Sequence, residues 1–269
     1  MAGADIKVSV RDLAKQFPIK VGGRARIVHA LNGVSFDVAD GEFIALTGRS
    51  GCGKTTTLRI VLGLEQATEG TVKVGGRLVT GCGYDRGMVF QHAELLPWRT
   101  AVENVEFGLE VKGIAKAERR RIALQALELV GLGDSVDRRP DQLSGGMKQR
   151  VGLARALAID PEVLLMDEPF GALDAQIRED MQVELIRLHE QTRKTVIFVT
   201  HDLDEAVLLA DRVFVFSPKG VIEEIVNIDI PRPRTDAVAI RGSEEFQKKR
   251  YHIWRLLKLT DAKTSVAAA

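Results

Sequence analysis

A glycine-rich segment between an apolar strand and a helix has the residue types that bind phosphate groups. Residues 48–55 read Gly-Arg-Ser-Gly-Cys-Gly-Lys-Thr and follow the strand-like residues 42–46. The backbone N–H groups of such a loop and the N-terminus of the next helix form a positive hollow for the oxygens of a di- or triphosphate. Lys54 would add a charge near the β- and γ-phosphates, Thr55 would bind Mg²⁺, and Thr56 would donate to a phosphate oxygen.

The segment fits the P-loop pattern of Gly, four residues and Gly-Lys-Thr. The alternative is a glycine-rich turn with an exposed lysine. At average glycine usage a chance match in a chain of this length occurs roughly once in a hundred, and the flanking strand and helix make it rarer. The predicted nucleotide-binding residues are therefore Gly48, Arg49, Ser50, Gly51, Cys52, Gly53, Lys54, Thr55 and Thr56.

Two adjacent carboxylates end a second apolar run. Residues 163–168 read Val-Leu-Leu-Met-Asp-Glu, which places Asp167 and Glu168 at the carboxyl edge of the expected sheet, where open α/β folds bind ligands. Asp167 suits a role at Mg²⁺, and Glu168 can accept a hydrogen bond from the attacking water and orient it toward the γ-phosphate. Alone, such a pair is more often solvated or a helix cap, but the P-loop in the same chain favours the catalytic interpretation.

His201 follows the apolar residues 196–199, so it also reaches the carboxyl edge of the sheet. An imidazole there can contact the γ-phosphate and help to align the water. The remaining histidines have no comparable placement and are interpreted as surface or packing residues: His29, His92, His189 and His252.

The composition is that of a folded globular protein. The chain has 269 residues, of which 45% are hydrophobic and 28% charged, and its net charge of +1 favours neither a nucleic-acid binder nor a binder of acidic ligands. Its longest apolar runs have the length of strands, so we expect no membrane span. The first residues show no basic segment followed by an apolar core, which predicts no secretory signal and a cytosolic location. Cys52 and Cys82 are then expected to be free thiols.

Apolar strand-like segments alternate with helical spacing, which predicts an α/β fold with a mostly parallel sheet covered on both faces. The middle third differs, because it has helical spacing at Val102, Val105 and Leu109 and again at Ile122, Leu124, Leu127 and Val130, with a third helix near Gly145. We therefore expect a helical subdomain over about residues 92–158 within a domain of residues 1–230. Residues 231–269 are basic and predict a tail that contains a helix.

Residues 143–150, Leu-Ser-Gly-Gly-Met-Lys-Gln-Arg, precede a predicted helix, with Ser144 as a candidate N-cap and two glycines that leave backbone N–H groups uncovered. By itself this is a capping motif. Together with Gln91, Asp167-Glu168 and His201 it resembles the ABC transporter ATPase family over nearly the whole chain. By that resemblance these segments are the signature, Q-loop, Walker B motif and switch histidine, and Leu173-Asp174 is the D-loop.

The resemblance implies an ATPase that uses ATP and Mg²⁺, and a P-loop NTPase fold with an antiparallel β subdomain and an inserted helical subdomain. It implies a head-to-tail dimer in which ATP lies between the P-loop of one subunit and Ser144, Gly145 and Gly146 of the other. Gln91 would contribute to catalysis beside Glu168 and His201, and would share Mg²⁺ with Thr55 and Asp167. Phe17 matches the family's adenine-stacking aromatic residue, although a buried strand aromatic is an equal alternative.

Three segments resemble the nitrate, sulfonate and taurine importer branch: residues 81–87, residues 95–98 and the tail residues 246–257. This branch implies two permease subunits, an extracytoplasmic solute-binding protein, and a peripheral location at the cytoplasmic face of the inner membrane. Residues 95–98, Leu-Leu-Pro-Trp, suit a loop that receives a helix of a partner, but they could equally close the core of the helical subdomain.

Three rival functions share some of these motifs. An exporter ATPase has every catalytic motif, and only residues 81–87 and the tail weigh against it. A non-catalytic ATP-sensing module has no need of Glu168 or His201. An ABC ATPase of DNA maintenance would need long heptad arms, and residues 92–142 show no sustained heptads.

Overall fold

The computed structural model describes residues 5–21 and 24–267, which form two compact units. The first unit comprises the residues up to 83 and those from 194 onward, and the second comprises residues 84–193. Residues 1–4, on which the expectation of no secretory signal partly depends, lie outside the described residues. No helix in the described part of the chain combines the length and the apolar character needed to cross a membrane.

The first unit contains an antiparallel sheet in the order β2-β1-β4-β5. Its strands are β1 (Ile6–Val21), β2 (Arg24–Ala39), β4 (Glu69–Val74) and β5 (Arg77–Leu78). Val8 and Val10 are fully buried and lie opposite Val38 and Phe36 of β2. Their alternation with polar residues is the reason that this segment forms a strand with one face in the core.

The same unit contains mostly parallel strands that carry the P-loop. These are β3 (Phe43–Gly48), β8 (Thr195–Val199), β9 (Arg212–Phe216) and β10 (Ile222–Asn227). Strand β3 pairs in parallel with both β8 and β9, while β10 is antiparallel to β9. All residues of β3 and β8 are buried, as expected for central strands of a parallel sheet.

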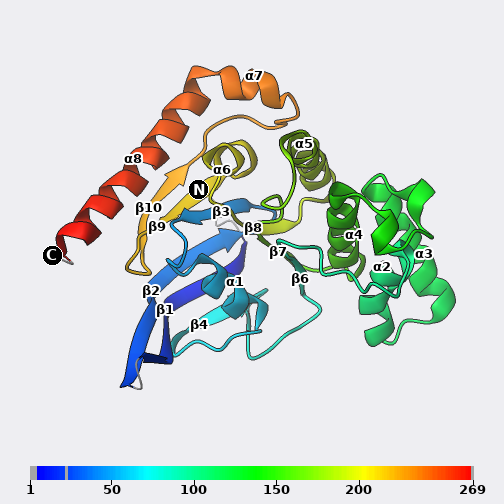
Figure 1. Cartoon of the computed structure of the whole chain (residues 1–269), viewed down its shortest axis with the longest axis horizontal. Helices are drawn as coiled ribbons and strands as arrows, with labels where there is room; N and C mark the ends of the chain where they lie inside the picture. The colour runs from blue at the N-terminus through cyan, green and yellow to red at the C-terminus, as the bar shows by residue number, and fades with distance from the viewer. Residues whose placement is uncertain (1–4, 22–23, 268–269) are drawn as a thin grey trace. The chain divides into compact units, whose positions relative to one another are not determined.

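Four helices complete the first unit: α1 (Lys54–Leu62), α6 (Leu203–Leu209), α7 (Ala237–Gly242) and α8 (Glu244–Ala267). The long helix α8, red in Figure 1, packs against α6, α7, β9 and β10. Phe246, Ile253 and Thr260 recur every seven residues and are buried, so one stripe of α8 faces this unit. The basic segment from residue 231 thus contains a helix that packs on the unit rather than a free chain.

The second unit pairs two parallel strands with a group of helices. Its elements are β6 (Arg86–Val89), α2 (Ala101–Val111), α3 (Lys116–Leu129), the short 3₁₀ turns η1 (Gly133–Ser135) and η2 (Pro140–Gln142), α4 (Gly145–Ala158), β7 (Val163–Asp167) and α5 (Ala175–Thr192). Helices α2, α3 and α4 pack on one another. The start of α2 is fixed by Thr100 and Glu103, which exchange side-chain to backbone hydrogen bonds in a capping box.

The helical spacing read from the sequence is confirmed at most positions. Val102, Val105, Leu127 and Val130 are fully buried, and α4 begins at Gly145 as expected. Leu124, which belongs to the same apolar pattern, is exposed. The buried stripe of α3 passes through Ala123 instead, a small residue that apolar periodicity alone does not distinguish from a surface alanine.

We expect Ile253→Ala to destabilise the protein by about 2–5 kcal/mol, because it leaves a cavity under α8. The matched control is Leu259→Ala on the same helix, whose side chain is 51% exposed whereas that of Ile253 is 0% exposed. Leu259→Ala should change the free energy of unfolding by no more than about 0.5 kcal/mol. Equal shifts of the urea midpoint in the two variants would show that α8 is not packed on the first unit.

Candidate functional site

The P-loop begins where β3 leaves the core and ends where α1 starts. Gly53 is the residue directly before the helix and has a φ of 101°. As a glycine it has no side chain that could cap the first N–H groups of α1. No acidic residue lies in the first turn of α1. The positive end of the helix dipole therefore faces the loop without a side-chain carboxylate on that turn, as an anion site requires.

Two glycines of the loop are required by its geometry. A Cβ at Gly53 would lie 2.5 Å from both the Ala30 carbonyl oxygen and the Leu31 side chain. A Cβ at Gly48, whose φ is 153°, would lie 2.8 Å from the Phe216 carbonyl oxygen. The loop can pass this close to β2 and β9 only without side chains.

The Lys54 side chain folds back across the loop. It is 5% exposed, and its Nζ donates to the carbonyl oxygens of Gly48 at 2.8 Å and Arg49 at 3.0 Å. The two carbonyl oxygens hold the ammonium group inside the loop, where phosphate oxygens would be attracted to it. The cradle and this ammonium fit a nucleotide phosphate chain.

The other P-loop side chains divide by exposure. Arg49, Ser50 and Gly51 are exposed, and Thr55 and Thr56 are half-buried. Cys52 is buried and packs inside the loop, where burial raises the pKa of its thiol. Thr57, which the sequence analysis did not single out, donates from Oγ1 to the Gly53 carbonyl oxygen at 3.0 Å and so tightens the first turn of α1.

His201 lies at the same sheet edge as the P-loop. Strand β8 runs parallel to β3, with Val199 opposite Leu46, and the Thr200 N–H donates to the Leu46 carbonyl oxygen at 3.2 Å. His201 is exposed and precedes α6, which Asp202 caps. Parallel pairing thus delivers the histidine and Gly48 to one edge, the usual ligand-binding edge of such sheets.

Phe17 lies in β1 opposite Val28 and is half-buried. The Lys15 ammonium lies 4.8 Å from the centroid of the Phe17 ring and also bonds Glu65 at 2.7 Å. One ring face of Phe17 therefore carries a cation, which leaves the opposite face as the surface on which a base could stack. Its role at adenine stays a prediction.

In the second unit, Asp167 is the last residue of β7 and Glu168 follows it, while Gln91 follows β6. These strands are parallel, with Val89 opposite Met166. Gly171 marks where the two segments meet, because a Cβ there would lie 3.2 Å from the Gln91 amide nitrogen and 3.4 Å from the Glu168 carbonyl oxygen. Glu168 itself has a φ of 46°, a backbone region that non-glycine residues seldom adopt and that is frequent at functional sites.

Two residues of α4 hold the segment around Gln91 in place. Gln149 donates to the Phe90 carbonyl oxygen at 2.8 Å. Arg155 donates to the carbonyl oxygens of Ala93 at 2.6 Å and Glu94 at 2.8 Å. The segment is therefore fixed to the helix that begins at the signature.

The signature forms the start of α4. Ser144 caps the helix by accepting from the Met147 N–H at 3.2 Å, and the first turn holds no acidic residue. A Cβ at Gly146 would lie 2.5 Å from the Ile177 side chain, so this glycine allows α4 and α5 to approach closely. Gly145 is exposed and, with Gln91 and Leu173, lines a hollow of about 520 Å³ in this unit.

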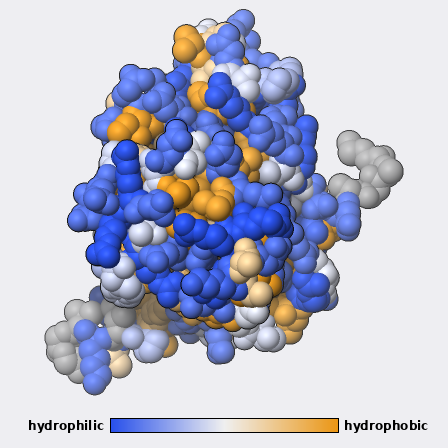
Figure 2. All heavy atoms as spheres, turned by 90° about the vertical axis from the view of Figure 1, so that its right-hand side faces the viewer, coloured by the Kyte–Doolittle hydropathy of each residue, from blue (hydrophilic) through white to orange (hydrophobic). Residues whose placement is uncertain are grey.

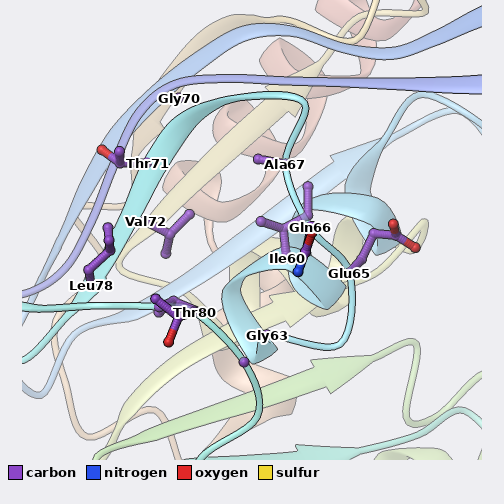
Figure 3. Close-up of a pocket in the computed structure, with 12 residues that line it drawn as sticks. Ile60, Gly63, Glu65, Gln66, Ala67, Gly70, Thr71, Val72, Leu78 and Thr80 are labelled. Carbon is purple, nitrogen blue, oxygen red and sulfur yellow. The ribbon is translucent and has the colours of Figure 1, made fainter.

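A separate pocket of about 310 Å³ in the first unit is lined by Ile60, Gly63, Glu65 and Thr80 among others (Figure 3). It lies at the C-terminal end of α1, the end opposite to the P-loop. The helix dipole is negative there, so this pocket does not suit the phosphates of a nucleotide.

Acidic, histidine and cysteine side chains are the groups that most often bind metal ions. Within residues 5–21 and 24–267, no group of three or more His, Cys, Asp or Glu side chains could hold a metal ion. Mg²⁺ is commonly held by one or two carboxylates together with substrate phosphates and water. The Thr55 hydroxyl and the Asp167 carboxylate are oxygen ligands of that kind.

A sequence model of the family described as "ABC transporter" matches residues 31–171. An ABC transporter ATP-binding protein of Methanocaldococcus jannaschii is 51% identical over 254 residues, which cover 94% of this chain and 92% of that protein. The chain belongs to the ABC transporter family, as an ATP-binding subunit. Its fold is that of the ABC ATPases.

Two further comparisons place this ABC subunit among known proteins. The bicarbonate transport ATP-binding protein CmpD of a Synechocystis species is 45% identical over 248 residues, covering 91% of this chain and 86% of CmpD. A solved structure of the ATP-binding cassette MJ0796, a dimer in a post-hydrolysis state bound to ADP and Pi, matches with a TM-score of 0.72 and 34% identity. That match covers 83% of this chain and all of the cassette, 100%.

Burial predicts different reactivity for the two cysteines. Cys52 is buried with a raised thiol pKa, whereas Cys82 is exposed. At neutral pH iodoacetamide should alkylate Cys82 and leave Cys52 unmodified, because the thiolate is the reactive form. Peptide mass spectrometry measures this, and the urea-unfolded protein, in which both should react, is the control. Rapid alkylation of Cys52 in the folded protein would contradict the loop packing.

Proposed function

We propose that the chain hydrolyses Mg-ATP to energise an ABC importer for a small anion. The observation that carries this is the P-loop cradle, in which close-approach glycines and the buried Lys54 ammonium surround the start of α1. Such a site binds a nucleotide through its phosphates, and hydrolysis needs in addition a water-orienting carboxylate.

In this proposal the phosphates are bound by residues 48–56, and Phe17 stacks on adenine. Thr55, Gln91 and Asp167 would hold Mg²⁺, which neutralises charge on the β- and γ-phosphates. Glu168 orients the attacking water, assisted by Gln91 and by His201, which contacts the γ-phosphate.

We further propose that two copies close over ATP. Ser144, Gly145 and Gly146 of one subunit would meet the γ-phosphate bound to the P-loop of the other. The support is the acid-free start of α4, a second helix end suited to an anion, and the dimeric state of the related MJ0796 cassette. Closure would exclude water and strengthen each electrostatic contact.

Exposed apolar side chains on the second unit support a membrane permease as partner. Trp98 is 67%, Val111 62% and Phe107 40% exposed, and Figure 2 shows apolar patches set among hydrophilic side chains on the face that it presents. Asn104 holds the loop before Trp98 by accepting from the Leu96 N–H at 2.7 Å. A rigid loop that offers an exposed aromatic anchor is typical of a protein interface.

The solute is proposed from the importer branch. The sequence resembles subunits for nitrate, sulfonate or taurine, and the relatives named for bicarbonate transport extend this set of small anions. We propose two permease subunits, an extracytoplasmic solute-binding protein and a location at the cytoplasmic face of the membrane. Within the chain, residues 1–230 would be the ATPase domain, with a helical subdomain over about 92–158, and 231–269 an appended segment.

Glu168→Gln should retain ATP and trap the dimer, because it removes the water-orienting carboxylate and leaves the cradle intact. Size-exclusion chromatography with light scattering should show monomers without nucleotide and dimers with Mg-ATP. Lys54→Ala is the control, since it should weaken ATP binding and show no shift. A Glu168→Gln protein that hydrolyses ATP at the wild-type rate would refute the assignment of this carboxylate.

Trp98→Ala should uncouple the subunit from its permease. We expect ATP affinity and basal hydrolysis within about twofold of wild type, because Trp98 is exposed and outside the P-loop, while co-purification with the permease falls at least about tenfold, the loss of one hot-spot residue. Tyr84→Ala, a second exposed aromatic of the same unit, is the matched control. Unchanged co-purification of the Trp98 variant would exclude this loop as the docking site.

A further inference from the structure

A buried hydroxyl lies directly before His201. Thr200 is 2% exposed, and its Oγ1 donates to Oε2 of Glu205 at 2.6 Å. The same Oγ1 accepts from the Asp202 N–H at 3.0 Å. Thr200 thus bonds two residues that follow the histidine, so the backbone of His201 lies within a short hydrogen-bonded turn.

Glu205 completes this turn from the first turn of α6. Its side chain is buried, and its backbone N–H donates to Oδ1 of Asp202 at 3.2 Å, as does the Asp204 N–H at 2.8 Å. An acidic side chain is favoured in the first turn of a helix, and the hydrogen bond from Thr200 gives one of its buried oxygens a partner. The hydrogen bonds among Thr200, Asp202 and Glu205 therefore fix the backbone conformation of the turn between β8 and α6.

The hydrogen-bonded turn of residues 200–205 is also bonded to the strand that carries the P-loop. The Thr200 N–H donates to the carbonyl oxygen of Leu46, two residues before Gly48. The backbone of Thr200 is thereby tied to β3, and its side chain is tied to α6. The backbone position of His201 relative to the P-loop depends on both bonds.

We propose that Thr200 and Glu205 are positioning residues, which hold His201 in the place that ATP hydrolysis requires. This inference rests on the proposed function, since it presumes that His201 acts in that reaction. A displacement of about 1 Å can lower a rate on the order of a hundredfold, so the buried pair has a catalytic consequence although neither residue touches ATP.

The matched control lies at the other end of the same strand. Thr195 is 1% exposed, and its Oγ1 accepts from the Gly41 N–H at 2.9 Å and lies 3.4 Å from Oδ1 of Asp40. Thr195→Val removes a buried hydroxyl with similar partners, a backbone N–H and a carboxylate, from the end of β8 remote from His201.

The first test compares Thr200→Val with Thr200→Ser and Thr195→Val in the full chain. Thr200→Val should lower kcat about tenfold with the ATP dissociation constant within about twofold, and Thr200→Ser, which keeps the hydroxyl, should restore kcat. Thr195→Val should lower the melting temperature comparably and leave kcat unchanged. A Thr195→Val protein that loses as much kcat as Thr200→Val would overturn the proposal.

The second test repeats Thr200→Val in a His201→Ala background by single-turnover hydrolysis. If the hydroxyl acts through His201, the second substitution should cause no further loss of rate, because there is no imidazole left to misplace. The same fold-loss in both backgrounds would show a purely structural role and overturn the proposal.

Failure of the proposed function gives a different pattern. A wild type without ATPase activity, or a His201→Ala protein with full activity, would refute the catalytic role of the histidine. The imidazole ¹H–¹⁵N resonances of His201 would then still report whether Thr200 and Glu205 hold the His201 ring in place. Thr200→Val should shift and broaden them and Thr195→Val should not, whereas identical spectra for both variants would refute the positioning itself.

Discussion

The parallel ladder between β3 and β8 is the constraint on which the first unit depends. Both strands are buried along their whole length, so their register is set by the fit of apolar side chains in the core rather than by any polar residue at their ends. With Val199 opposite Leu46, the chain must emerge from both strands at one edge. The glycine-rich loop and His201 are neighbours in the fold for that reason, although some 150 residues of sequence separate them.

Arg234 of the C-terminal segment holds the other end of α6, the helix that follows His201. The buried guanidinium of Arg234 donates to the carbonyl oxygens of Leu208 at 3.2 Å and Ala210 at 2.6 Å, and to those of Ile228 at 3.3 Å and Ile230 at 2.8 Å. A cation at a helix C-terminus satisfies carbonyl groups that have no partner within the helix. The helix that begins after His201 is thus capped by Asp202 at one end and held by Arg234 at the other.

In the second unit, helix α4 holds the segment around Gln91 in place. Ser144 begins this helix, Gln149 holds Phe90, and Arg155 holds Ala93 and Glu94. One helix therefore carries the signature at its N-terminus and fixes the segment after Gln91 along its side. A displacement of α4 would move both together, which would couple the proposed nucleotide site to the proposed partner contact near Trp98.

The sequence alone determined the fold class and the family, and it predicted the chemistry of the motif residues. The glycines, the lysine and the carboxylates at strand ends can be predicted from the sequence, because their residue types and local spacing already indicate a phosphate-binding site. Apolar spacing alone does not say which side chains a neighbouring helix covers: in α3 Leu124 is exposed, whereas Ala123 is buried.

Only the tertiary structure decided which ordinary residues support the motifs. Thr200, Glu205, Gln149, Arg155 and Arg234 have no signal in the sequence, because threonines, glutamates and arginines are common and mostly solvated. Their roles arise from hydrogen bonds, most of them to groups brought close by packing. Local sequence thus specified the reactive groups, while long-range contacts, set by burial of the strands between them, decided what holds those groups in place.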